Sequence, residues 1–284
     1  MRVVVLGTGR MAVGIAAAAA GGSHPTTVVG RNAERARQAA REATTRAGRP
    51  VHGGPLDASA IGVADLVIET IVEDAGAKMD VLRLVGELGG PGLLVATNTS
   101  SLSLTELSAV LDRPERFFGL HFLNPADRTC LVEVAGGAST SAGALDAAAA
   151  FVESMGKHPI RVNAEVKGFV WNRIQFAVFR ECLSLLEDGV ADAADIDLAV
   201  SAGLAPRWMA IGPLGTADLG GLDTFVRVSG QLFPELSNAA EVPGSVVAGE
   251  ALRPLAGADR AEVLELRERM LEIAARVVKA KAGH

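Results

Sequence analysis

Two titratable residues, His121 and Glu133, lie in short segments, GLHFL and LVEV, that otherwise have the composition of buried strands. An imidazole titrates near neutral pH, so it can accept and return a proton during a reaction. A neighbouring carboxylate can orient the ring and stabilise the imidazolium, which burial would otherwise disfavour. A lone buried histidine is more often a core residue. The pair therefore suggests proton transfer only if the rest of the chain supplies a reaction that needs it.

The segment VVVLGTGRMAVGIA carries Gly7, Gly9 and Ala12 in a G-x-G-x-x-A spacing, directly after an expected strand and at the start of an expected helix. Gly7 permits a tight turn, and Gly9 lets backbone amides approach a pyrophosphate. The small residue at position 12 lets helix and strand pack closely. A Gly-rich turn without a ligand is the alternative, but the strand–turn–helix context favours dinucleotide binding.

The end of the second expected strand bears on the choice of cofactor. NAD enzymes usually place an acidic residue there, which binds the ribose 2′-hydroxyl, whereas this chain has Gly30 followed by Arg31. Gly30 leaves room for a 2′-phosphate, and Arg31 offers a permanently charged planar fork. We expect NADP, with NAD as the alternative. The simpler interpretation of Arg31 is a solvated turn residue.

Short apolar runs alternate with helical segments through the first half of the chain, which is typical of βαβ units and a parallel sheet. The expected strands cover 2–6, 26–30, 65–72, 92–98, 116–123 and 158–162. After about residue 163 the apolar period is close to 3.6 residues. We predict an α/β fold with an N-terminal Rossmann-type doubly wound sheet in residues 1–163, followed by an all-helical C-terminal domain in residues 164–284.

Composition narrows the function classes. A net charge of −6 argues against a broad nucleic-acid surface, because phosphate binding needs clustered lysines and arginines. Cys130 and Cys182 lie far apart without Cys/His ligand spacing, so we expect two buried thiols and neither a disulfide nor a metal site. The first residues lack a signal-peptide pattern, and the alanine-rich run is too short to span a bilayer. We expect a cytoplasmic protein that is not bound to a membrane.

Several motifs, taken in order, resemble the L-3-hydroxyacyl-CoA dehydrogenase family, which includes the 3-hydroxybutyryl-CoA dehydrogenases. They are GTGRMAVGIA, IETIVEDAGAKMDVL, NTSSL, GLHFLNP with LVEV, KGFVWNR and GPLGTADLGGLDT, and they cover most of the chain. The resemblance implies a Rossmann-type domain, a helical domain that forms a homodimer contact, and hydride transfer between a secondary alcohol carbon and a nicotinamide.

The resemblance also implies a role for individual residues. His121 matches the general base and Glu133 its orienting partner. Ser100 and Asn172 match the serine and asparagine that contact the substrate oxygen, although Ser100 alone would be interpreted as a turn or N-cap residue. Family positions near the nicotinamide and its ribose are matched by Glu73, Lys78, Asn98 and Asn124, each of which could equally be a surface or turn residue.

Two departures from the family bear on the substrate. The interval between Gly30 and Glu73 is too short for the family's long basic hairpin, which helps to hold the CoA nucleotide; the remaining candidate phosphate contacts are Arg41, Arg46 and Arg49. The segment PADRTC, which contains Asp127, Arg128 and Thr129, brings polarity near the catalytic segment unless it simply faces water.

These departures favour a short, polar 3-hydroxyacyl thioester carried on CoA or on an acyl-carrier protein. The alternatives are a dehydrogenase of a free hydroxy acid, carnitine- or gulonate-like, and a catalytically silent dinucleotide-binding protein. The intact set of Ser100, His121, Glu133 and Asn172 argues against a silent protein.

Overall fold

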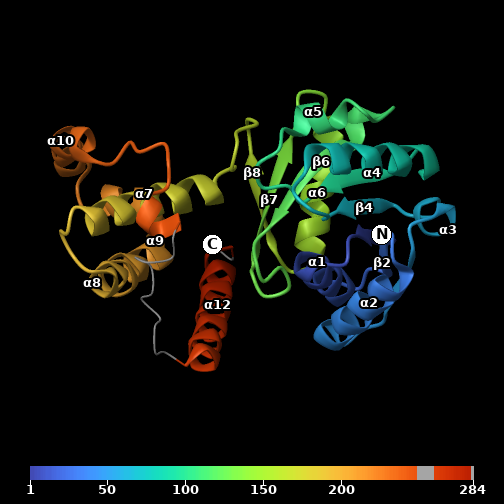
Figure 1. Ribbon diagram of the computed structural model, residues 1–284, viewed down its shortest axis with the longest axis horizontal. Coiled ribbons are helices and arrows are strands. Elements are labelled where there is room, and N and C mark those ends of the chain that lie inside the picture. The colour runs from blue at the N-terminus through green and yellow to red at the C-terminus, as the bar shows by residue number, and fades with distance from the viewer. Residues whose placement is uncertain (248–258, 283–284) are drawn as a thin grey trace. The chain divides into compact units, whose positions relative to one another are not determined.

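A computed structural model describes residues 1–247 and 259–282 (Figure 1). The chain forms two compact units, Met1–Asn172 and Arg173–His284. The domain boundary expected between residues 163 and 164 stays a prediction.

An eight-stranded sheet is the frame of the first unit. In spatial order its strands are β3 (Val51–Pro55), β2 (Thr26–Gly30), β1 (Val3–Leu6), β4 (Leu66–Glu69), β5 (Leu94–Thr97), β6 (Phe117–Phe122), β7 (Leu131–Gly136) and β8 (His158–Val162). The first six are parallel, β7 runs antiparallel to β6, and β8 is parallel to β7. The strand order turns back at β1, which confirms the predicted doubly wound Rossmann-type sheet.

Helices cover both faces of this sheet (Figure 1). They are α1 (Arg10–Gly21), α2 (Ala33–Ala47), α3 (Ala58–Ile61), α4 (Ala75–Leu88), α5 (Leu104–Ser108) and α6 (Ala142–Ser154). Because strand side chains alternate between faces, Val3 and Val5 pack with α1, α2 and α6, whereas Val4 and Leu6 pack with α3, α4 and α5. The strands are thus buried on both sides, which explains their nearly continuous apolar runs.

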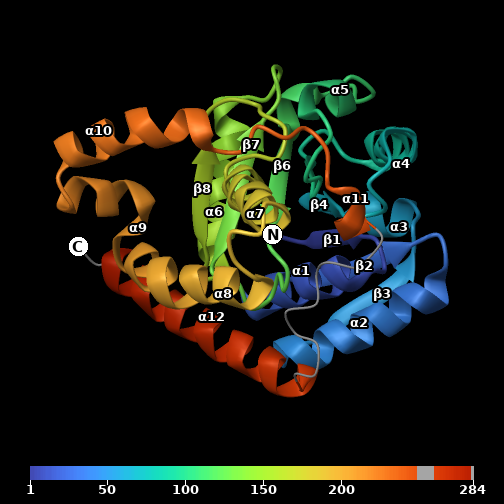
Figure 2. The same cartoon turned by 60° about the vertical axis from the view of Figure 1, so that its left-hand side comes forward.

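Strand β3 is the one strand of the sheet that the apolar pattern does not indicate. Its sequence, VHGGP, contains two glycines and a histidine, so it has little β propensity. It forms at the edge of the sheet, where it pairs with β2, and α1 and α2 pack beside β2 and β3 (Figure 2). A Cβ at Gly53 would lie 2.6 Å from the Ala36 carbonyl oxygen, so glycine permits α2 to lie close to this strand.

The second unit is built from helices, and no strand occurs in its described residues, as predicted for the C-terminal part. The helices are α7 (Trp171–Glu187), which begins at the end of the first unit, α8 (Ala193–Leu198), a π-helical segment (Ala199–Leu204), α9 (Ala205–Leu219), α10 (Leu222–Leu232), α11 (Gly244–Val247) and α12 (Arg260–Ala282). Gly212 has a φ of 74° and precedes Pro213, so α9 is kinked there. Within residues 1–247 and 259–282, no helix is long and apolar enough to cross a membrane.

Candidate active site

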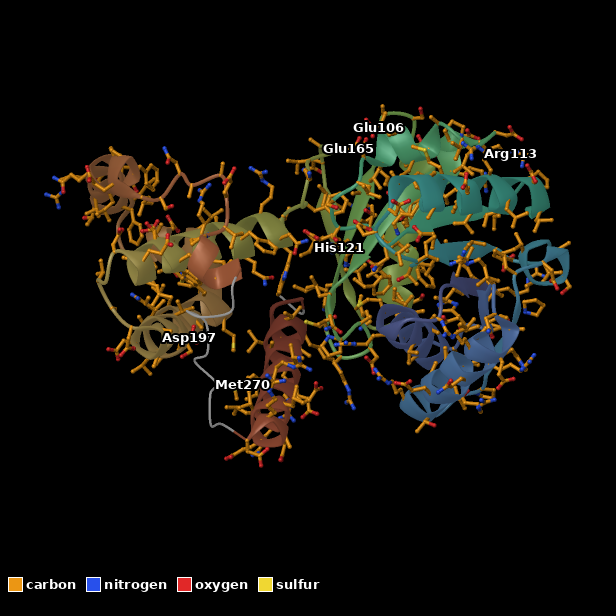
Figure 3. The ribbon with its side chains drawn as sticks, viewed as in Figure 1. Glu106, Arg113, His121, Glu165, Asp197 and Met270 are labelled. Atoms are coloured by element: carbon orange, nitrogen blue, oxygen red, sulfur yellow. The ribbon has the colours of Figure 1, made fainter. Side chains whose placement is uncertain are left out.

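The side chains of His121 and Glu133 meet on one face of the sheet. Antiparallel pairing of β6 with β7 sets the two residues directly opposite each other, and cross-strand partners point to the same face. His121 Nδ1 lies 2.6 Å from Glu133 Oε2, and both residues are buried. The carboxylate is the acceptor, so Nδ1 carries the proton and Nε2 is left with a lone pair for proton transfer. Figure 3 marks His121 within the sheet.

The second oxygen of Glu133 binds the backbone where α7 begins. Oε1 accepts hydrogen bonds from the amides of Val170 at 2.8 Å and Trp171 at 2.7 Å. Burial raises the pKa of Glu133, but the hydrogen bonds from His121 and the two amides outweigh that effect and lower the pKa below its ordinary value. Glu133 is therefore held as a carboxylate.

Ser100 lies in a loop that is held by the Glu73 carboxylate. Oε1 of Glu73 accepts hydrogen bonds from the Thr99 hydroxyl at 2.6 Å, the Ser100 amide at 2.9 Å and the Ser101 amide at 3.0 Å. Burial raises the pKa of Glu73, while these donors and Lys78 lower it, with a net decrease. In the structure Glu73 acts within the protein, where it fixes the backbone that presents Ser100.

Lys78 is likewise engaged inside the protein. Its side chain is 1 % exposed, and Nζ lies 2.7 Å from Glu69 Oε1 and 3.5 Å from Glu73 Oε2. Glu69 is fully buried and also accepts a hydrogen bond of 2.6 Å from the Thr97 hydroxyl. The sequence interpretation overlooked Glu69, although a glutamate at the end of the apolar strand LVIE is the same kind of signal that singled out Glu133.

The three asparagines predicted to lie at the site, Asn98, Asn124 and Asn172, come from three different segments of the chain. Asn98 follows β5, and its Oδ1 accepts a 2.8 Å hydrogen bond from the amide of Phe122, which fixes β6 next to His121. Asn124 is exposed after β6, and Asn172 is half-buried in the first turn of α7. Among the described residues, no hydrogen bond joins His121 to the side chain of Ser100 or of Asn172, so the structure pairs His121 with Glu133 alone.

The turn between β1 and α1 has the geometry of a pyrophosphate cradle. Gly7 has a φ of 138°, and a Cβ there would lie 2.5 Å from the carbonyl oxygen of Thr70, so only glycine fits. A Cβ at Gly9 would meet no atom within 4 Å, so the glycine faces open space. Within the described residues no side chain caps the start of α1, so its first amides can bind an anion, while buried Ala12 packs against the sheet. The residues present fit a dinucleotide.

The end of β2 offers no carboxylate to a ribose. Asn32 caps α2 by accepting a hydrogen bond from the Arg35 amide at 3.0 Å, so Gly30 and exposed Arg31 form the turn before the helix. A Cβ at Gly30 would lie 2.9 Å from Thr8 Cγ2. A larger residue at position 30 would therefore require the Thr8 side chain to move.

Two of the polar residues in the loop after β6, Asp127 and Thr129, make contacts within the protein. Thr129 is buried, and its hydroxyl donates to the Leu123 carbonyl oxygen at 3.3 Å. Asp127 lies 3.5 Å from Arg46, which also pairs with Glu42. Asp127 and Thr129 are thus engaged within the protein, while Arg128 is exposed.

Two of the three candidate phosphate arginines are likewise paired with carboxylates. Arg46 pairs with Glu42 and Asp127, and Arg41 pairs with Glu34 at 3.2 Å, whereas Arg49 is exposed. The charges of Arg41 and Arg46 are therefore partly neutralised before any phosphate approaches.

Comparison of the sequence with known protein families identifies the family of this chain. Residues 2–166 match the family described as 3-hydroxyacyl-CoA dehydrogenase, NAD binding domain, and residues 168–251 match its C-terminal domain. The chain belongs to the 3-hydroxyacyl-CoA dehydrogenase family. The resemblance predicted from the motifs is thereby confirmed.

Individual relatives have several activities. The chain is 37 % identical over 188 residues to 5-formyl-3-hydroxy-2-methylpyridine 4-carboxylate 5-dehydrogenase of Mesorhizobium japonicum, an alignment that covers 66 % of this chain and 61 % of the relative. It is 39 % identical over 174 residues to 3-hydroxybutyryl-CoA dehydrogenase of Clostridioides difficile, with 61 % and 60 % covered. The aligned part thus spans about 60 % of these curated relatives.

A solved structure of a 5-formyl-3-hydroxy-2-methylpyridine 4-carboxylic acid 5-dehydrogenase, described as an NAD⁺-dependent dismutase, superposes with a TM-score of 0.86 at 28 % identity. The superposition covers 100 % of this chain and 99 % of that one. Together with the NAD binding domain model, it supports a nicotinamide cofactor, and NAD more than NADP.

Proposed function

We propose that this protein is a nicotinamide-dependent oxidoreductase that interconverts a secondary alcohol and a ketone at the 3-position of a short, polar 3-hydroxyacyl thioester. The hydrogen-bonded pair of His121 and Glu133 carries the proposal, because it supplies an oriented base on the sheet whose first turn forms the dinucleotide cradle. The family and the 3-hydroxybutyryl-CoA dehydrogenase relatives support this substrate class.

In the direction of alcohol oxidation, the substrate hydroxyl gives its proton to Nε2 of His121 while the hydride leaves carbon. Glu133, kept ionised by three hydrogen bonds, stabilises the imidazolium that forms. Ser100 and Asn172 would hold the substrate oxygen. When bound, the nicotinamide supplies the hydride acceptor. In the reverse direction His121 returns the proton to the ketone oxygen as hydride is delivered.

A free hydroxy acid is the second candidate substrate, and two observations favour it. Helix α2 ends at Ala47 and β3 begins at Val51, so no inserted hairpin is present at this point to hold a CoA nucleotide. A solved relative that matches the whole chain is described as a dehydrogenase of a pyridine carboxylic acid. In that case the protein would recognise the free carboxylate of the substrate, where a thioester enzyme recognises CoA or an acyl-carrier protein.

For the cofactor, the comparisons support NAD more strongly, whereas Gly30 and Arg31 support NADP. The support for NADP comes from the end of β2, where Gly30 stands in place of a carboxylate and the permanently charged Arg31 follows it. We propose that the protein prefers NADP to NAD, and the ratio of kcat/KM for the two cofactors tests this. A strong preference for NAD would refute it.

We further propose that the second unit carries a homodimer interface. Several large apolar side chains in it are exposed, among them Leu214 at 85 %, Leu219 at 81 % and Phe233 at 69 %. Exposed apolar side chains that form a contiguous patch are typical of an association surface. Light scattering at micromolar concentration checks the mass, and a monomer would contradict the proposal. The cytoplasmic location stays a prediction.

A substrate panel distinguishes the candidates. Matched 3-hydroxyacyl groups are offered on CoA, on an acyl-carrier protein and as free acids, with both cofactors, to the native chain and to His121→Gln. The thioester proposal expects turnover of thioesters that His121→Gln abolishes while dinucleotide affinity changes little. Turnover of free acids alone would establish the second candidate. Tight dinucleotide binding without any turnover would indicate a catalytically silent protein.

A further inference from the structure

Residues 163–170, which we call the strap, connect β8 to α7 and directly precede the first turn of α7, which contains Asn172. Its Phe169 is buried and packs against the imidazole of His121, with ring centroids 5.6 Å apart. Phe169 has a φ of 48°, a left-handed conformation that a bulky residue adopts only where the surroundings hold it. The last residue of the strap, Val170, and the first residue of α7, Trp171, supply the two amides that bind Glu133.

The other part of the strap is held by Glu165. Its Oε1 accepts hydrogen bonds from the Ser103 hydroxyl at 2.9 Å and the Thr105 amide at 3.2 Å, and it also accepts from the Leu104 amide. Its Oε2 accepts from the Thr105 hydroxyl. Burial raises the pKa of Glu165, but these donors lower it overall, so the carboxylate is ionised at neutral pH.

The donors lie at the start of α5, a few residues after Ser100. Ser103 caps α5 by accepting a hydrogen bond from the Glu106 amide at 3.2 Å, so Glu165 adds a second acceptor to the same helix end. The Thr105 hydroxyl in turn accepts a hydrogen bond from the Ala138 amide at 2.9 Å, which ties the contact to the loop after β7. Glu165 is thus joined directly to the start of α5, and through Thr105 to the loop after β7.

We propose that Glu165 is a positioning residue for the reaction. Its carboxylate fixes the strap to the segment that follows Ser100. The strap in turn holds the Phe169 ring against the imidazole of His121. It also keeps the amides of Val170 and Trp171 within hydrogen-bond distance of Glu133. The inference rests on the proposed function, because it assigns Glu165 a role through the His121–Glu133 pair. Four donors from three consecutive residues, Ser103 to Thr105, converge on the Glu165 carboxylate.

Glu106 offers a matched control. It lies in the first turn of the same helix, and Figure 3 labels it close to Glu165 beside α5. It is exposed, and in the described part of the chain its side chain makes no hydrogen bond to the strap. Replacing either glutamate removes one negative charge from the same region, so a difference between the variants reports the strap contacts.

The experiment compares Glu165→Ala and Glu165→Gln with Glu106→Ala and Glu106→Gln, each assayed below its melting temperature. We expect Glu165→Ala to lower kcat by about 10- to 100-fold, because small misplacements of catalytic groups cost that much. Glu165→Gln should have a smaller effect, since it keeps one acceptor oxygen. Dinucleotide affinity should stay within about twofold, because the cradle at β1 and α1 is not touched. The Glu106 variants should match the native chain.

A double-mutant cycle with Thr105→Val tests the route of the effect. If Glu165 acts through Thr105, the valine substitution should lower kcat less in the Glu165→Ala background than in the native chain. Equal kcat for the Glu165 and Glu106 variants would overturn the inference, as would a parallel loss of dinucleotide affinity. Turnover by His121→Gln, measured in the same series, would instead refute the proposed function.

Discussion

Replacing Glu133 by glutamine removes a charge while it keeps the shape of the side chain. One amide oxygen can still accept the hydrogen bonds from Val170 and Trp171, which lie 2.8 and 2.7 Å from Oε1 in the native chain. The other position then presents an NH₂ group to Nδ1 of His121. That group donates, so it favours the tautomer with the proton on Nε2, which cannot accept the proton of the substrate.

The electrostatic attraction between Glu133 and the imidazolium sets the expected loss of kcat. A carboxylate and an imidazolium with centres about 4 Å apart attract each other by about 4 kcal/mol at an effective dielectric constant of about 20. Because about 1.4 kcal/mol corresponds to a tenfold change in rate, the loss of this attraction predicts a kcat lower by about a thousandfold. The altered tautomer acts in the same direction.

The assay follows the absorbance of the reduced nicotinamide at saturating substrate. Fluorescence titration measures dinucleotide affinity, and thermal melting checks the fold. The exposed Glu153, on α6, provides the control substitution Glu153→Gln. We expect loss of kcat in Glu133→Gln with unchanged dinucleotide affinity. A kcat within tenfold of the native value would refute the argument that Glu133 stabilises a charged imidazole.

Three further predictions concern stability and cofactor choice. Lys78→Met should lower the free energy of unfolding by about 3–5 kcal/mol, because it removes the cationic partner of the fully buried Glu69 carboxylate; a loss below about 1 kcal/mol in urea unfolding would contradict this. Gly30→Asp combined with Thr8→Ser, which removes the methyl group 2.9 Å from the new Cβ, should raise the NAD-to-NADP ratio of kcat/KM by about tenfold, and an unchanged ratio would show that the end of β2 does not select the cofactor. Because the folded-state pKa of Glu73 lies below its ordinary value of 4.5, its contribution to stability is present above that pH and is lost as pH falls through the lower pKa. Unfolding measured from about pH 6 to about pH 3 should therefore be less steep with pH for Glu73→Gln, and an equal slope would count against the shift.

Much of the first unit could be predicted from local sequence. The glycine spacing at 7 and 9, the β-branched runs and the capped helix after Asn32 reflect backbone conformation and burial over a few residues. The pairing of His121 with Glu133 was accessible as well, because it follows once two neighbouring apolar segments form an antiparallel pair. Strand β3 was missed because its glycines have a packing role against α2 that local propensity does not show.

The amino-acid sequence by itself determined the family, the sheet apart from β3, the helical second unit and the candidate pair of His121 and Glu133, since these depend on periodicity and on short ordered motifs. Only the tertiary structure decided that Lys78 is buried between two carboxylates and that Glu165 binds the start of α5. The Glu165 contact joins segments far apart in the chain, with a sequence separation of 60 between Thr105 and Glu165, whereas Lys78 meets Glu69 at a separation of 9, across the turn from β4 into α4. A charged side chain has no local preference for such a partner, so its role is settled only when folding brings the donors within hydrogen-bond distance.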